Sequence, residues 1–68
     1  MNNTILLNKF RIHEAATNEG LKMKEVAELI GTSYQTMQYR FTHGWRAAEA
    51  RELARLLKVE LKVLEDFI

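Results

Sequence analysis

A stripe of polar side chains in the middle of the chain carries its most specific chemistry. Gln35, Gln38, Tyr39 and Thr42 recur at the spacing i, i+3, i+4 and i+7, which places them on one face of an α-helix. A Gln amide both donates and accepts hydrogen bonds, as a bidentate contact to adenine in the major groove of DNA requires. The pattern therefore indicates a surface suited to hydrogen bonding with base edges.

The surroundings of this stripe are free of acidic residues. No Asp or Glu occurs from residue 29 to residue 48, whereas Arg40, Arg46 and a protonated His43 are cationic. Residues 21–46 hold four Lys and Arg against two Glu, while the whole chain has a formal charge of only +1. Such a face meets a polyanion without repulsion. The small overall excess argues against tight, sequence-independent binding and favours a small protein that docks through one face.

A short helix is predicted directly before the stripe. Met23, Val26, Ala27 and Ile30 recur at i, i+3, i+4 and i+7, and Leu29 lies beside them. The small side chain of Ala27 lets another helix cross closely. Gly31 is expected to end this helix, because glycine readily takes the positive φ of a sharp turn.

A second helix is predicted to begin after a turn of only two residues, Gly31 and Thr32. Ser33 occupies the N-cap position, where its hydroxyl can accept hydrogen bonds from free backbone N–H groups. The helix then extends from Tyr34 to about Thr42. Its apolar side holds Met37 and Phe41 at i and i+4, opposite the polar stripe.

The chain after the stripe predicts two further helices. Residues 47–57 form the first, with an apolar face of Ala50, Leu53, Ala54 and Leu57 and a solvated face of charged residues, namely Glu49, Arg51, Glu52 and Arg55. Trp45 precedes it as a core residue or lid, since base stacking by a duplex reader needs an inserted wedge. Residues 60–68 form the last helix. Its apolar end either completes a small core or contacts a second copy of the chain in a homodimer, through Leu64, Phe67 and Ile68.

Residues 1–20 allow two interpretations. The favoured one is a helix from about Thr4 to Thr17, with Asn2, Asn3 or Thr4 as its cap. Its apolar residues lie on two flanks, which predicts burial on both sides; they are Ile5, Leu6, Phe10, Ile12 and Ala16. The other is a short strand, because Phe10 and Ile12 alternate with Arg11 and His13. His13 has no second ligand nearby, so it is expected to be a partly exposed helix residue with no catalytic or metal role.

Length and composition limit the remaining options. A chain of 68 residues forms one domain with a modest core, and its 47% hydrophobic and 28% charged residues are typical of a folded protein. The chain contains no acid–base pair, no nucleophile with a base and no metal-ligand constellation, so we expect no enzyme activity, no cofactor and no metal. The absence of cysteine, of a membrane span and of a signal sequence leads us to expect a cytoplasmic protein.

The residues AELIGTSYQTMQYRF, 27–41, resemble the helix-turn-helix of the lambda Cro and repressor family. The shared features are a small residue, a glycine four residues later, a hydroxyl-containing turn and an apolar residue six after the glycine. Phe41 and Gly44, ten and thirteen residues after Gly31, match the spacing of Cro. The resemblance implies an all-α fold of four to five short helices with a central helix-turn-helix at about residues 23–44. The family usually has Thr or Ser followed by Gln at the entrance of the motif, where this chain has Lys22 and Met23.

The same resemblance implies which side chains would touch DNA. Base contacts fall at positions three, four, seven and eight after Gly31, which are Tyr34, Gln35, Gln38 and Tyr39. Phosphate contacts are expected from residues at either end of the two helices, namely Lys22, Lys24, Ser33, Arg40, Thr42, His43 and Arg46. For Lys22 and Lys24, solvated surface lysines are an equally good interpretation.

Two functions from different classes follow as expectations. The first is a sequence-specific DNA-binding regulator, a phage-type repressor or Cro-like switch protein that acts on double-stranded operator DNA in a bacterial or phage-infected cell. The second is a protein-binding modulator or antirepressor that keeps the fold and grips a partner repressor. The low net charge, the unusual entrance to the motif and the apolar chain end favour the second modestly.

Overall fold

The computed structural model describes residues 4–65, and this part of the chain is mostly helical. Its five helices and two short strands occur in the order β1 (Thr4–Ile5), α1 (Lys9–Asn18), α2 (Met23–Leu29), α3 (Tyr34–His43), β2 (Trp45–Arg46), α4 (Ala47–Leu57) and α5 (Leu61–Leu64). The prediction of a predominantly helical chain with four to five helices is confirmed. The small sheet was not part of that prediction.

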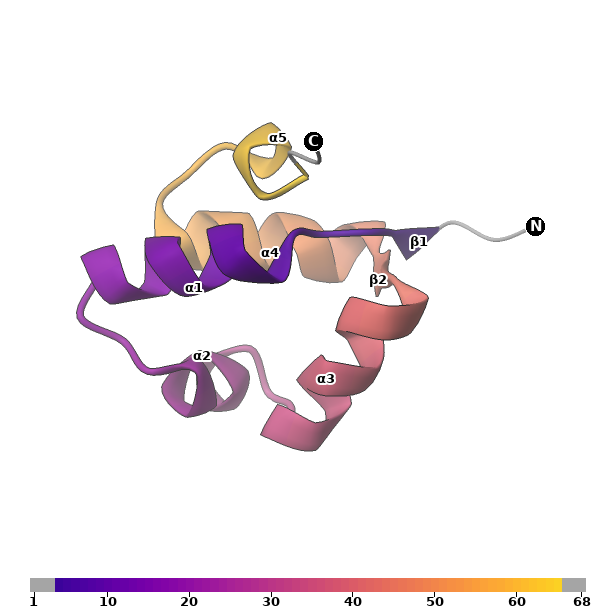
Figure 1. Ribbon diagram of the computed structural model, residues 1–68, viewed down its shortest axis with the longest axis horizontal. Coiled ribbons are helices and arrows are strands. Elements are labelled where there is room, and N and C mark those ends of the chain that lie inside the picture. The colour runs from indigo at the N-terminus through magenta and orange to yellow at the C-terminus, as the bar shows by residue number, and fades with distance from the viewer. Residues whose placement is uncertain (1–3, 66–68) are drawn as a thin grey trace.

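The helices surround a core centred on α1 and α4, which cross the middle of Figure 1. α5 packs against both of them on one side. α2 packs on α1 from the other side, and α3 packs on α2. β1 and β2 pair at the start of α4, with Thr4 opposite Arg46 and Ile5 opposite Trp45 in an antiparallel arrangement. As a result, the α2–α3 pair lies apart from α5.

α4 contributes the largest apolar face to the core. Ala50, Leu53, Ala54 and Leu57 are all buried, as the i, i+3, i+4, i+7 pattern predicted, and the helix has the predicted bounds. Buried residues from the other elements complete the core: Leu7, Ile12, Ala15, Ala16, Val26, Ala27, Met37, Trp45 and Leu64. Each large buried side chain of this kind stabilises the fold by about 1.5–3 kcal/mol.

The predicted helix from Thr4 to Thr17 is wrong in its first part. Thr4 and Ile5 lie in a strand, and the helix begins at Lys9 because the Asn8 side chain caps it. The Asn8 Oδ1 atom accepts hydrogen bonds from the N–H groups of Phe10 (2.9 Å) and Arg11 (3.2 Å). The alternative of a short strand is wrong at residues 10–13, which are helical, although a strand does occur earlier, at Thr4–Ile5.

This later start changes which side chains are buried near the N-terminus. Leu7 and Ile12 point into the core, whereas Leu6 and Phe10 are exposed. The prediction of burial on two flanks therefore fails for Leu6 and Phe10. Leu29 at the end of α2 is likewise exposed, although it was grouped with the apolar face of that helix.

The last helix is shorter than the predicted segment of residues 60–68. α5 covers only Leu61–Leu64, and it follows a turn in which Lys58 takes the left-handed conformation with φ 60°. Leu64 is completely buried within its own chain, so this side chain has no free surface to offer a second copy. Phe67 and Ile68, the other residues of the expected dimer contact, lie outside the described residues.

The turn between α2 and α3 follows the prediction closely. α2 ends at Leu29, Gly31 has φ 79°, and α3 begins at Tyr34 after Ser33. The Thr32 N–H donates to the carbonyl of Ala27 at 2.9 Å, which closes the end of α2. Only four residues, 30–33, therefore separate α2 from α3.

We predict that Gly44→Ala destabilises the protein more than Gly20→Ala. Gly44 has φ 105° and ψ 159°, a region that is essentially restricted to glycine and costs other residues about 1–3 kcal/mol. An added Cβ would also lie 2.8 Å from the Cβ of Thr4 in β1, whereas at Gly20 (φ 73°) it would meet nothing within 4 Å. Urea unfolding of both variants measures the difference. Equal losses would show that the contact with β1 contributes nothing.

Candidate nucleic-acid interface

The start of α3 is fixed by a cap within the chain. The Ser33 Oγ atom accepts a hydrogen bond from the Thr36 N–H (3.1 Å), as the sequence predicted, and donates one to the Thr36 hydroxyl (2.9 Å). The Ser33 hydroxyl, an expected phosphate contact, is thus already engaged in the cap.

The inner side of α3 fixes the rotation of the helix about its axis. Met37 is fully buried, and the partly buried Phe41 ring meets the Trp45 indole edge-on, with 5.7 Å between ring centroids. These contacts confirm the predicted apolar face. They hold the opposite side of α3 outward, where the expected base contacts lie.

The outer side of α3 brings the four expected base contacts together. Tyr34, Gln35 and Tyr39 are exposed, and Gln38 is partly exposed. Within residues 4–65 neither Gln amide has a hydrogen-bond partner, so each can bond to a ligand without losing a contact in the chain. Tyr39 differs from them, because its ring lies 4.1 Å from the ring of His43, centroid to centroid.

The last turn of α3 and the strand after it hold three of the expected phosphate contacts. Thr42, His43 and Arg46 are all exposed. The Thr42 hydroxyl donates to the Gln38 carbonyl (3.4 Å), and the His43 ring packs on Tyr39. His43 and Arg46 therefore present cationic or polar groups beyond the end of this outer side of α3.

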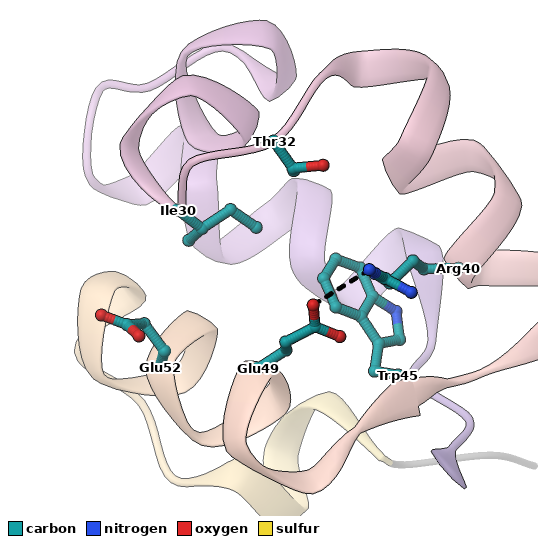
Figure 2. Close-up of a pocket in the computed structure, with 6 residues that line it drawn as sticks. All are labelled: Ile30, Thr32, Arg40, Trp45, Glu49 and Glu52. Carbon is teal, nitrogen blue, oxygen red and sulfur yellow. Dashed lines mark ion pairs between the residues drawn. The ribbon is translucent and has the colours of Figure 1, made fainter.

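Arg40, by contrast, lies in an ion pair with α4. Its Nη2 atom is 3.0 Å from the Glu49 Oε2 atom, and both side chains are partly buried beside the Trp45 indole, as Figure 2 shows. The same residues border a small cavity of about 40 Å³. Arg40 thus neutralises a carboxylate within the chain, and a phosphate would have to compete with that carboxylate for it.

Glu49 is a structural residue that the sequence reasoning missed. Its Oε1 atom also accepts a hydrogen bond from the Arg46 N–H (3.3 Å), so one carboxylate caps α4 and holds the end of α3. The signal was present, because Glu at the third position of a helix commonly caps it. The charge pattern of residues 47–57, by contrast, predicts Glu49 on a solvated face.

The entrance of α2 places two more cations near α3. The Lys22 N–H donates to the Glu25 Oε1 atom at 2.8 Å, which supplies a cap where the usual Ser or Thr is missing. The side chains of Lys22 and Lys24 are exposed, and with Tyr34 they border a hollow of about 550 Å³. The structure therefore brings expected phosphate contacts from α2 close to the first residue of α3.

Comparison with protein families, with curated proteins and with solved structures finds no match for this chain. No helix among residues 4–65 is both long and apolar enough to cross a membrane. In the same range, no three His, Asp or Glu residues gather as a metal-ligand set would. Function is therefore inferred from the geometry of the described residues.

We predict that Glu49→Ala costs about 1–2 kcal/mol of folding free energy. The variant loses a helix cap, worth about 0.5–2 kcal/mol, and a partly exposed ion pair, worth at most about 1 kcal/mol. Glu52→Ala is the matched control, because Glu52 borders the same cavity on α4 without an ion pair to Arg40. Thermal and urea unfolding provide the test, and indistinguishable stabilities of the two variants would contradict the role of Glu49.

Proposed function

We propose that this chain is a sequence-specific DNA-binding regulator that reads the major groove with α3. In this proposal α2, the turn at Gly31 and α3 form a helix-turn-helix of the Cro and repressor kind. The observation that carries it is the exposed, acid-free face of α3 with two unpartnered Gln amides. The major groove is about 12 Å wide and admits one α-helix.

The distribution of charge along α3 supports the same docking. Lys22 and Lys24 lie near its start, and His43 and Arg46 lie at its end. A helix of ten residues is about 15 Å long, so these groups bracket the reading face and can reach the phosphates on its two sides. Base contacts would come from Gln35 and Gln38, with Tyr34 and Tyr39 beside them.

Regulation by this chain requires no chemistry. A protein bound to an operator excludes polymerase from the same DNA, which is how a phage repressor or Cro-like switch protein acts. A second copy bound one helical turn away would double the number of base pairs read. Because Leu64 is buried in its own chain, a dimer contact would have to use other surface.

We predict that Gln35→Ala or Gln38→Ala weakens binding to the specific site by about 1–3 kcal/mol and leaves non-specific binding nearly unchanged. Folding should survive, because neither side chain has a partner within residues 4–65. Affinities for the selected site and for scrambled DNA, measured beside thermal unfolding, provide the test. The site itself comes from a selection of genomic fragments on the purified protein.

Met37→Ala is the contrasting variant, because it removes a fully buried side chain and should cost about 2–5 kcal/mol of stability. Loss of DNA binding there would report unfolding and not contact. Two folded Gln variants that bind the selected site as tightly as the parent would exclude α3 as the reading helix.

We also predict a moderate dependence of DNA binding on salt. With about four to six phosphate contacts per subunit, the slope of log affinity against log salt concentration should be about −4 to −5. Titrations between low and physiological salt measure this slope. A slope near zero would contradict DNA binding and favour a partner protein.

A further inference from the structure

A groove lies where α1 faces the starts of α2 and α3. It consists of two adjoining hollows of about 220 and 550 Å³ that share His13, Met23 and Tyr34. We call it the α1 groove. Besides the three shared residues, it is defined by Lys9, Phe10, Lys22 and Lys24. The smaller hollow lies below the roughly 300–1,000 Å³ of small-molecule sites, and its size suits a single inserted side chain.

The floor of the α1 groove is apolar and open to solvent. Phe10 is 81% exposed and Tyr34 is 44% exposed, and the Met23 side chain between them is only partly buried. Single exposed apolar residues are ordinary, but three that line one hollow form a surface of the kind that binds partners. Phe10 adds nothing to the core, because α1 packs inward through other residues, namely Ile12, Ala15 and Ala16.

The charged residues around this floor are all basic. Lys9 borders the smaller hollow, and Lys22 and Lys24 border the larger one. No carboxylate from residues 4–65 lines either hollow. A basic rim around an apolar floor is complementary to a segment that carries both acidic and apolar side chains.

We propose that the α1 groove binds an acidic, amphipathic peptide segment of another protein. An apolar side chain of the segment enters the smaller hollow between Phe10, Met23 and Tyr34, and flanking carboxylates meet Lys9 and Lys24. DNA fits the groove less well, because phosphates match the lysines but provide no apolar group to cover Phe10 and Met23. Since Tyr34 and Lys24 also belong to the proposed DNA interface, peptide and DNA exclude each other; only this competition rests on the proposed function.

A designed peptide tests the proposal directly. The probe is a fluorescein-labelled helix of about 15 residues, with Leu and Phe at i, i+3, i+4 and i+7 and Glu elsewhere. A scrambled peptide of the same composition is its control. Fluorescence anisotropy measures affinity, and amide shifts of the ¹⁵N-labelled protein locate the site. We expect saturable binding of the designed peptide and shifts centred on Phe10, Met23 and Tyr34.

Matched variants separate the α1 groove from the rest of the surface. Phe10→Ala should weaken peptide binding about tenfold or more, and Lys24→Glu should weaken it in a salt-dependent way. The matched controls are Leu29→Ala and Lys62→Glu, which change an exposed apolar residue and an exposed lysine outside the groove. Both variants should bind the peptide as tightly as the parent does. All four positions lie on the surface, and thermal unfolding verifies that each variant is folded.

Three outcomes of the peptide titrations would overturn the proposal: no saturable binding, equal binding of the scrambled peptide, or full affinity for the designed peptide in the Phe10→Ala variant. A Phe10→Ala variant that loses affinity for DNA by the same factor as for the peptide would also overturn it, because the groove would then belong to DNA. Phe10-dependent peptide binding by a chain that binds no DNA would support the groove and refute the proposed function. The experiment can therefore refute peptide binding in the α1 groove without refuting DNA binding by α3, and the reverse.

Discussion

Burial of the Trp45 indole is the constraint on which the arrangement of this small domain depends. It is the largest fully buried side chain, and it lies where β2 joins α3 to α4. Its ring meets Phe41 of α3 edge-on, and its backbone pairs with Ile5 of β1. The indole thus fills the core at the point where the chain passes from α3 to α4.

The position of α3 is set by contacts at its C-terminal end, around Trp45, and by contacts at its start. Close to Trp45, the Arg40–Glu49 ion pair joins α3 to α4. At the start of α3, the Ser33 cap and the small, buried Ala27 let the helix begin close to α2. Met37 anchors the middle in the core. The outward direction of Gln35 and Gln38 is thus set by contacts made on the opposite side of the helix.

The parts of the fold that sequence predicted well are those determined by neighbours within one or two helical turns. The Ser33 cap, the turn at Gly31 and the apolar face of α4 belong to this group. β1 could not be predicted in the same way, because its partner Arg46 lies 42 residues from Thr4 along the chain. The cap at Asn8 is a local contact and was missed for a different reason, because a helix from Thr4 satisfies local preferences equally well.

The candidate site shows the same division. The polar stripe of α3 and the exposure of Gln35, Tyr39 and Thr42 follow from periodicity alone. The engagement of Arg40 by Glu49 depends on how α3 crosses α4, which no local pattern encodes. The α1 groove was not foreseen either, because Phe10 was expected inside the core and lies on the surface.

The β1–β2 pairing also has a consequence for how this chain folds. It closes a loop that contains α1, α2 and α3. The pairing of only two residues on each strand must therefore offset the conformational entropy lost when a loop of about forty residues closes. Local helices and their neighbouring contacts form before such a distant pairing is favourable. We therefore expect the ladder to join last and to open first, so that amide hydrogens bonded between β1 and β2 exchange with solvent while those in the middle of α4 stay protected.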